Sequence, residues 1–337
     1  MKSFSALRYL AGLKGASWRQ RVTLLGVFLC AAQLCRVTRS ERIDHVHLHS
    51  CADAGHLGAL GKILGGPSFS LTLHGDLKVY GLDHDQKFSH ASWVSAVTRP
   101  LRNQIVDNTE MPKHRVPVIW MGVDTSEFTP SPAPASTPDK PLHLATVARL
   151  IPQKGHLHAL KAIRRVIDAG IQVKYSIAGS GPFEGEIRKK ILELNLTEHV
   201  EMLGSIGEQE VRALLDAVDV FLLPSYGLGE AAPVSVMEAM ACGLPVICSR
   251  IGGTTDMIRH KVDGWLVDQR NEDQRVEAII LFGKDLERRK EIGAAARESA
   301  MSLFDHRRNA QRLLNCIRRN YTQPIDESVI EDVALSS

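Results

Sequence analysis

The sequence lacks a strong charge of either sign and lacks the cysteine spacings of metal-binding or disulfide-rich domains. Its 41 basic and 38 acidic residues leave a formal net charge of +3, so electrostatics do not indicate nucleic acid as a partner. None of the six cysteines forms a C-x2-C pair, which argues against a disulfide framework. A reduced, cytoplasmic setting fits this cysteine usage best.

The sequence also lacks a long uninterrupted apolar run. The mainly apolar stretch from Val22 to Leu34 is too short to span a bilayer, and basic residues lie on both sides of it. It resembles the basic and hydrophobic regions of a signal peptide but has no clear small-residue cleavage site. We favour a buried or membrane-touching helix over a cleaved signal, and the basic flanks suit contact between residues 1–42 and anionic lipid headgroups.

With 337 residues, the chain is too long for one ordinary core and suits two α/β domains. The proline-rich segment from Thr129 to Pro141 predicts an extended linker. We therefore expect a first domain over residues 1–128, a linker over 129–141, a second domain over 142–304 and a frayed tail over 322–337.

Short apolar runs alternate with helical patterns on both sides of the linker, which predicts parallel, doubly wound sheets. The first domain is expected to contain strands near 45–49, 68–73, 92–96 and 116–119. The second is expected to contain strands near 142–147, 172–178, 199–203, 219–223, 245–248 and 264–267. Helical patterns over 285–303 and 306–320 end the chain.

Two glutamates eight residues apart, Glu230 and Glu238, lie in the most informative segment. A buried strand is expected from Val218 to Leu223, and a helix is expected after Pro233. Glu230 then lies on the loop at the carboxyl end of a strand, where open α/β sheets bind ligands, and the helix start favours a phosphate. For an isolated glutamate, a solvated charge at a helix start would be the simpler interpretation.

This segment resembles the E-x7-E signature of family-4 retaining glycosyltransferases, which have the two-domain GT-B fold. Further matches follow in the family's order between residues 44 and 305, namely 118–128, Arg149 with Lys154, 177–182, 252–253 and 263–267. The resemblance implies two Rossmann-like domains facing a cleft, with a last helix over 305–321 that crosses back to the first domain.

The resemblance also implies roles for individual residues. Arg149 and Lys154 would bind the donor diphosphate, Glu238 the ribose hydroxyls and Glu230 the donor sugar. The other donor-binding candidates are Gly179, Gly181, Ala231, Pro233 and Val234. Ala231 stands where the family commonly has glycine, so its methyl group is expected to narrow the sugar pocket.

In the first domain, His74 ends a predicted strand, and the resembled family has a histidine there near the donor sugar. A structural and a catalytic role are about equally expected for it. His49 and Asp76 are acceptor-side candidates. His45, His47 and His49 share one strand face, but no second set of ligands accompanies them, so we expect no metal and no cofactor.

The chain departs from the family at its beginning. The first convincing strand is 45–49, so we expect a shortened first domain or a start codon placed too late. A dinucleotide fingerprint is disfavoured, because the glycines of 179–185 are off that pattern by one residue and follow the second strand of their domain.

The resemblance implies a retaining hexosyltransferase that uses a UDP- or GDP-sugar. Its acceptor would be a glycan or a lipid-linked glycan in exopolysaccharide or lipopolysaccharide synthesis, in the cytoplasm or peripherally at the inner face of the plasma membrane. Two alternatives stay open, a nucleotide-sugar-binding subunit completed by a partner chain and a sugar-nucleotide epimerase on the same fold.

Overall fold

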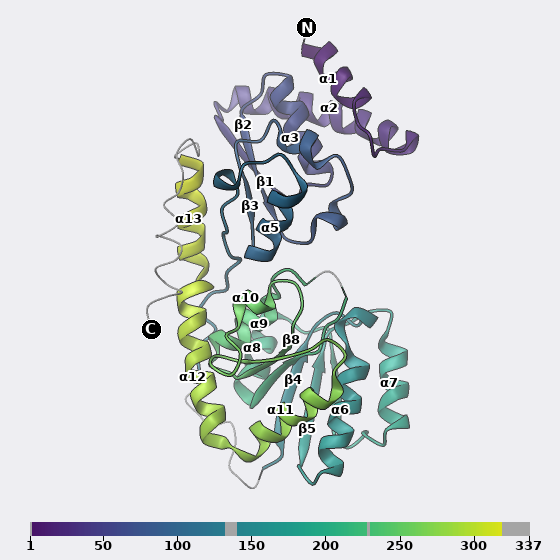
Figure 1. The fold of residues 1–337 in the computed structure, drawn as a ribbon, viewed down its shortest axis with the longest axis vertical. Coiled ribbons are helices and arrows are strands. Elements are labelled where there is room, and N and C mark those ends of the chain that lie inside the picture. Colours follow the sequence, from purple (N-terminus) through teal and green to yellow (C-terminus); the bar gives the residue numbers. More distant parts are fainter. Residues whose placement is uncertain (1, 132–139, 228–229, 319–337) are drawn as a thin grey trace. The chain divides into compact units, whose positions relative to one another are not determined.

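The computed structural model describes residues 2–131, 140–227 and 230–318, and the chain forms two compact units (Figure 1). The first unit contains residues 1–120 and the chain from 308 onward, and the second contains residues 121–307. The change from one unit to the other therefore comes eight residues before Phe128, where the sequence placed the end of the first domain. Most of the proline-rich linker, residues 132–139, and the tail lie outside the described residues.

The first unit contains a parallel sheet of three strands in the order β1-β2-β3, covered by helices. The strands are β1 (His45–His49), β2 (Ser68–Leu73) and β3 (Val94–Ala96), and the helices are α1 (Lys2–Ala11), α2 (Trp18–Ser40), α3 (Asp53–Ile63), α4 (His84–Phe88) and α5 (Arg99–Asn108). Helix α3 packs closely on the sheet, because Gly58 lies directly against the side chains of Leu48 and Phe69.

Two expectations for this unit were wrong. Residues 116–119 do not form a strand, since only Val118 makes a bridge, to Ala96. Pro117 has no N–H to donate and so cannot continue a ladder. The N-terminal stretch contains two helices where one was expected, because Ser17 and Gln20 form a capping box that starts α2 four residues before Val22.

The second unit contains a six-stranded parallel sheet with the order β6-β5-β4-β7-β8-β9. Its strands are β4 (Leu142–Val147), β5 (Val173–Ala178), β6 (Val200–Gly204), β7 (Val220–Leu223), β8 (Val246–Ser249) and β9 (Trp265–Val267). The strand order reverses between β4 and β7, which is the topological switch point of a Rossmann-like sheet.

Helices connect these strands and cover the sheet (Figure 1). They are α6 (His156–Asp168), α7 (Glu184–Glu193), α8 (Glu208–Ala217), α9 (Val234–Ala241), α10 (Thr254–Met257), α11 (Glu272–Lys284) and α12 (Leu286–Leu303). Apolar residues of α6 and α11 form one buried cluster with Leu144 and Leu222 of the sheet. The last helix, α13 (His306–Arg318), packs Leu313 and Cys316 against Trp93 of the first unit.

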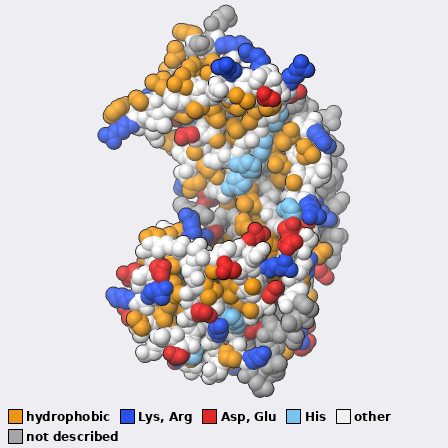
Figure 2. Space-filling model, turned by 180° about the vertical axis from the view of Figure 1, so that it is seen from behind, with side chains coloured by type: hydrophobic (Ala, Val, Ile, Leu, Met, Phe, Trp, Pro, Cys, Tyr) orange, Lys and Arg blue, Asp and Glu red, His pale blue; other side chains and the backbone are white. Residues whose placement is uncertain are grey.

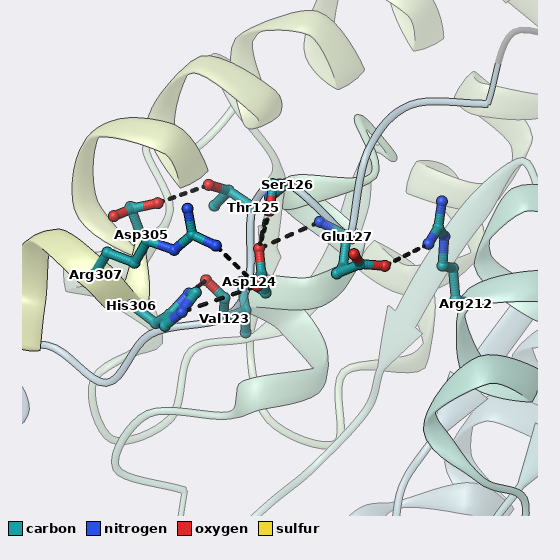
Figure 3. A network of polar contacts seen from close by, with 9 residues as sticks. All are labelled: Val123, Asp124, Thr125, Ser126, Glu127, Arg212, Asp305, His306 and Arg307. Atoms are coloured by element: carbon teal, nitrogen blue, oxygen red, sulfur yellow. Dashed lines mark hydrogen bonds and ion pairs between the residues drawn. The ribbon is translucent and has the colours of Figure 1, made fainter.

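Two chain segments of the second unit, residues 121–128 and 304–307, lie side by side (Figure 3). We call them the crossover segments, since the chain enters the unit through one and leaves it through the other. Val123 donates its N–H to the carbonyl of Phe304 at 2.8 Å and accepts from the N–H of His306 at 3.1 Å. The hydroxyl of Thr125 donates to the Asp305 carboxylate at 2.8 Å.

Charged side chains extend this network (Figure 3). The Asp124 carboxylate accepts hydrogen bonds from Ser126 and Glu127, and those from Ser126 are the main reason that its pKa is lowered. Arg307 lies 4.0 Å from Asp124, and Arg212 of α8 pairs with Glu127 at 2.8 Å. These pairs are largely exposed, so we assign the joining of the two segments mainly to the backbone hydrogen bonds.

Arg297 of α12 ties the first crossover segment to the end of α9. Its guanidinium donates to the carbonyls of Thr125 at 2.9 Å, Phe128 at 2.8 Å and Ala241 at 2.7 Å. Ala241 is the last residue of α9, so a cation also lies at the negative end of that helix.

We predict that Arg297→Ala destabilises the second unit by about 1.5–3 kcal/mol, because three carbonyls lose a charged donor. Arg307→Ala is the matched control, and its exposed pair should change stability by less than about 0.5 kcal/mol. Urea denaturation of both variants checks this, with hydrogen exchange of residues 234–241 as a local readout. Equal stability of the two variants would show that Arg297 does not hold α9.

Candidate functional site

The candidate site lies in the second unit, at the carboxyl ends of β4 and β7. These two strands pair in parallel, so the loops that follow them lie at the same edge of the sheet. The loop after β4 carries Arg149 and Lys154, and the loop after β7 carries Glu230. The N–H of Tyr226 donates to the carbonyl of Gln153 at 2.8 Å, which joins the two loops directly. The topology thus brings together three predicted site residues that are up to 81 positions apart.

Lys154 and Glu230 form an ion pair in which the ammonium group donates to the carboxylate. The hydroxyl of Ser225, which is fully buried, donates to the same Glu230 oxygen at 3.0 Å. Glu230 itself is buried, and a buried carboxylate is stable only when it is paired and hydrogen-bonded. Lys154 and Ser225 therefore hold Glu230 in place.

Glycines let the neighbouring loops approach one another. A Cβ on Gly179, which follows β5, would lie 2.0 Å from the carbonyl oxygen of Ala148, and one on Gly181 would lie 2.3 Å from that of Leu150. Gly252, which follows β8, has φ +53° and lies so close to the backbone oxygen of Glu230 that a side chain cannot fit. Gly179 and Gly181 thus shape the loop that carries Arg149, and Gly252 shapes the loop that carries Glu230.

The side chain of Arg149 is exposed, and its backbone carbonyl is contacted by a histidine side chain. The Nε2 atom of His156 lies 3.2 Å from the Arg149 carbonyl oxygen. His156 is buried at the start of α6, and its burial lowers the pKa of the imidazole. A neutral imidazole with Nε2 protonated can donate to this carbonyl, so His156 supports the loop without adding charge.

Glu238 is the fifth of the eight residues of α9, about one turn after the helix starts, and lies on the same segment as Glu230. Its side chain is partly buried, and this burial, together with the nearby charge of Glu208, raises its pKa from 4.5 to about 7. A poorly solvated carboxylate is well suited to accept hydrogen bonds from ligand hydroxyls.

The start of α9 contains the remaining donor-binding candidates. Ala231 is buried, Pro233 is the N-cap residue without a side-chain cap bond, and Val234 is the first helical residue. This agrees with the expected helix start after Pro233, and it places the N–H groups of the first turn close to Glu230 in sequence.

In the first unit, the structure brings His49 and His74 together at the carboxyl ends of β1 and β2. Their Nδ1 and Nε2 atoms are 2.8 Å apart, and the rings stack with centroids 5.1 Å apart. Burial, with a smaller effect of His49, lowers the pKa of His74. Asp76 does not join this pair, since its carboxylate accepts from the Gln104 amide at 2.8 Å.

His45 and His47 lie on the same face of β1, and a row of histidines is visible on the first unit in Figure 2. Each ring uses both nitrogens on hydroxyl groups of β2, His45 on Ser68 and Ser70, and His47 on Ser70 and Thr72. Within the described ranges, no group of three or more His, Cys, Asp or Glu side chains could hold a metal ion.

The sequence did not indicate that Ser225 and His156 belong to the site. It also did not indicate that Gly252 packs against the backbone of Glu230. Ser225 had a usable signal, because it is a polar residue two positions after a buried strand and just before a glycine-containing loop. His156 had no such signal, because nothing in the sequence indicates that its ring reaches back to the Arg149 carbonyl.

The two parallel-sheet units, with the candidate site at the switch point of the second, define a protein of the GT-B class. Solved structures agree with this fold. A glycosyltransferase from Rickettsia africae superposes with a TM-score of 0.78, covering 88% of this chain and 82% of that one at 19% identity. Anabaena Alr3699/HepE, crystallised with UDP, gives a TM-score of 0.75 over 86% and 82% of the two chains at 20% identity.

Residues 129–299, just over half of the chain, match the family model of glycosyl transferases group 1, and residues 8–127 match that of Glycosyltransferase Family 4. The chain belongs to the glycosyl transferases group 1 family. This confirms the family resemblance at the level of the fold and family, whereas the stereochemistry of transfer and the roles of the two glutamates stay predictions.

Named proteins are similar to this chain in sequence. A protein of Escherichia coli K12 assigned to colanic acid biosynthesis as glycosyltransferase WcaL is 37% identical over 51% of this chain and 43% of its own length. The amylovoran biosynthesis glycosyltransferase AmsK of Erwinia amylovora is 31% identical over 61% and 50% of the two chains. A UDP-Gal:α-D-GlcNAc-diphosphoundecaprenol α-1,3-galactosyltransferase of Escherichia coli is 26% identical over 79% and 73%. The chain spans about half the length of the first two of these relatives.

We predict that Glu238→Gln stabilises the folded chain above pH 7. The folded carboxyl group keeps its proton up to about pH 7, whereas the unfolded group releases it near 4.5. Its contribution to stability is therefore fully present below pH 4.5 and is lost as the pH rises through 7. Thermal melts across this window should show a gap between variant and parent that widens with pH. The exposed Glu198→Gln is the control, and a gap independent of pH would contradict the prediction.

Proposed function

We propose that this chain is a retaining glycosyltransferase that moves a hexosyl unit from a nucleoside-diphosphate sugar to a hydroxyl of a glycan or lipid-linked glycan in cell-surface polysaccharide synthesis. The observation that carries the proposal is the contact of Lys154 with Glu230 at the switch point, with Arg149 on the same loop as Lys154 and Glu238 on the helix that follows. Such a donor has a diphosphate between two rings that carry hydroxyl groups. The two cations suit the diphosphate, and the two carboxylates suit the hydroxyl groups of the two rings.

In this proposal the donor is bound part by part. The diphosphate takes the cations of Arg149 and Lys154, the ribose hydroxyls donate to Glu238, and the sugar hydroxyls donate to Glu230. Ala231 limits the space beside the sugar, and Gly179 and Gly181 let the backbone come close to the diphosphate. The galactosyltransferase of Escherichia coli is named for UDP-Gal, and a similar mannosyltransferase of Mycobacterium tuberculosis is named for GDP-mannose, so the base of the donor is left open.

The proposed chemistry needs no metal. The bond between the anomeric carbon and the diphosphate oxygen breaks, a bond forms from the acceptor oxygen to that carbon, and the acceptor proton passes to the leaving diphosphate on the same face. Negative charge grows on the diphosphate as its bond breaks, and the fixed cations stabilise it most in the transition state. His74, with His49 beside it, would act on the sugar and acceptor side, and Asp76 would contact the acceptor.

The proposed setting is the cytoplasm, with peripheral contact at the inner face of the plasma membrane through residues 1–42. A lipid-linked acceptor would place the reaction at such a surface. Among the described helices, one, α2, is long and apolar enough to cross a membrane by length and composition, and this criterion is also met by core helices and signal sequences.

We predict that Arg149→Ala and Lys154→Ala each lower turnover on the order of 10²-fold, because each removes charge stabilisation that grows in the transition state. Folding stability should change much less for Arg149→Ala, whose side chain is exposed. Lys189→Ala, an exposed lysine on α7, is the control. A survey of UDP- and GDP-sugars with a lipid-linked glycan acceptor provides the assay. Donor binding without transfer by the parent chain would favour the binding-subunit alternative.

We also predict that the product keeps the anomeric configuration of the donor and that EDTA leaves the rate unchanged. Anomeric NMR of the product tests the first statement, and an inverted product would exclude the front-face mechanism. Loss of activity with EDTA, restored by magnesium, would show that the cations of the site do not suffice.

A further inference from the structure

Helix α2 presents an apolar stripe on its outward side. Trp18, Val22, Leu25 and Leu29 are 71%, 58%, 50% and 68% exposed, respectively. Their spacing of four, three and four residues places them along one face of the helix. Phe4 and Leu7 of α1 add two further exposed apolar side chains. Such a set of large side chains in water indicates a surface that binds something.

The opposite side of α2 is firmly attached to the first unit. Leu24, Ala31 and Cys35 are buried, and the thiol of Cys35 donates to the carbonyl of Gly61 in α3 at 3.2 Å. The apolar stripe therefore lies on a different face of α2 from the one that packs on the unit.

The turn between α1 and α2 is also held in place. The guanidinium of Arg21 donates to the carbonyl of Leu10 near the end of α1 and to that of Ala16 in the turn before α2. The backbone N–H groups of Lys14 and Gly15 donate to the Asp83 carboxylate at 2.8 and 3.0 Å. The hairpin of α1 and α2 therefore offers its outward side as a preformed surface.

The charge of this hairpin differs from that of the rest of the chain. The first 40 residues contain seven of the 41 basic residues and none of the 38 acidic ones, so the remaining 297 residues carry a formal charge of −4. Exposed Arg19 and Arg36 lie near the two ends of the stripe, about 26 Å apart at 1.5 Å per residue. Figure 2 shows blue basic and orange apolar side chains together at the end of the first unit that carries α1 and α2.

We propose that the outward side of α1 and α2 docks on the surface of an anionic phospholipid bilayer, with α2 lying in the plane of the interface. The stripe enters the boundary between headgroups and acyl chains, and the arginines at its ends contact lipid phosphates. A spanning α2 would have to leave α3, which would break the contact between Cys35 and Gly61 and uncover the face of α3 that packs on α2. The proposal rests on the proposed function, which gives the chain a reason to meet lipid-linked acceptors.

The test uses the full chain and vesicles of phosphatidylcholine with or without phosphatidylglycerol. The parent should float with the anionic vesicles only, and salt should weaken the association. Leu25→Gln with Leu29→Gln should lower the partition coefficient about tenfold or more, and Arg19→Glu with Arg36→Glu should lower it at least as much. Leu192→Gln on α7, where the leucine is 66% exposed, and Lys189→Glu are the matched controls and should float like the parent.

The fluorescence of Trp18 adds a readout of depth. It should shift to the blue with anionic vesicles and be quenched by lipids brominated near the headgroup, and Trp18→Phe should lose this response. Alkaline carbonate should release the bound chain. Three results would overturn the proposal: flotation unchanged by the stripe variants, resistance to carbonate, which means a spanning helix, or a concentration-dependent dimer that the stripe variants abolish.

A measurement of donor binding distinguishes a failure of the lipid-surface proposal from a failure of the proposed function. Calorimetry with UDP- and GDP-sugars in the absence of lipid should give the same affinity for the parent and the stripe variants, because α2 belongs to the first unit and the donor residues to the second. Loss of flotation with intact donor binding therefore supports the lipid surface, whereas flotation without donor binding supports the lipid surface and contradicts the proposed donor site.

Discussion

Parallel pairing of β4 with β7 is the constraint on which the candidate site depends. It places two loops from distant parts of the sequence at one edge of one sheet, where the Lys154 ammonium meets the Glu230 carboxylate. Close approaches at Gly179 and Gly252 let the flanking loops approach this edge, and Ser225 and His156 fix the backbone and side chains around it. If β4 and β7 were not neighbours, Lys154 and Glu230 would not be in contact.

The strand alternation and the strand-loop-helix arrangement around Glu230 could be predicted from the sequence, because buried parallel strands are short apolar runs with clear ends. The residues at which helices and strands begin and end were harder to predict. The strand predicted over 116–119 does not form, because Pro117 has no N–H to donate to a neighbouring strand. Helix α2 begins earlier than the apolar run suggested, because Ser17 caps it. The hydrogen bonds of Ser225 and His156 could not be predicted, because they depend on contacts between loops that the sequence does not encode locally.

The chain combines two different surfaces. The second unit concentrates its functional candidates at one sheet edge, where the buried Glu230 carboxylate, its partner Lys154 and the exposed Arg149 favour a polar ligand. The first unit concentrates exposed apolar and basic side chains on α1 and α2, with no acidic residue among the first 40. Arg297 connects the end of α9 to a crossover segment, so the helix that carries Glu238 is fixed at its far end by the same side chain that orders the entry of the chain into the unit.

We propose that Lys154 and Glu230 exchange their mutual contact for contacts with the donor. A crystal structure of the chain with a bound UDP- or GDP-sugar tests it most directly. We expect the diphosphate on Arg149 and Lys154, the ribose hydroxyls on Glu238, and the Glu230 carboxylate turned from Lys154 toward the sugar hydroxyls. A donor bound at another edge of the sheet, or a diphosphate beside a Lys154 that stays paired with Glu230, would contradict the account.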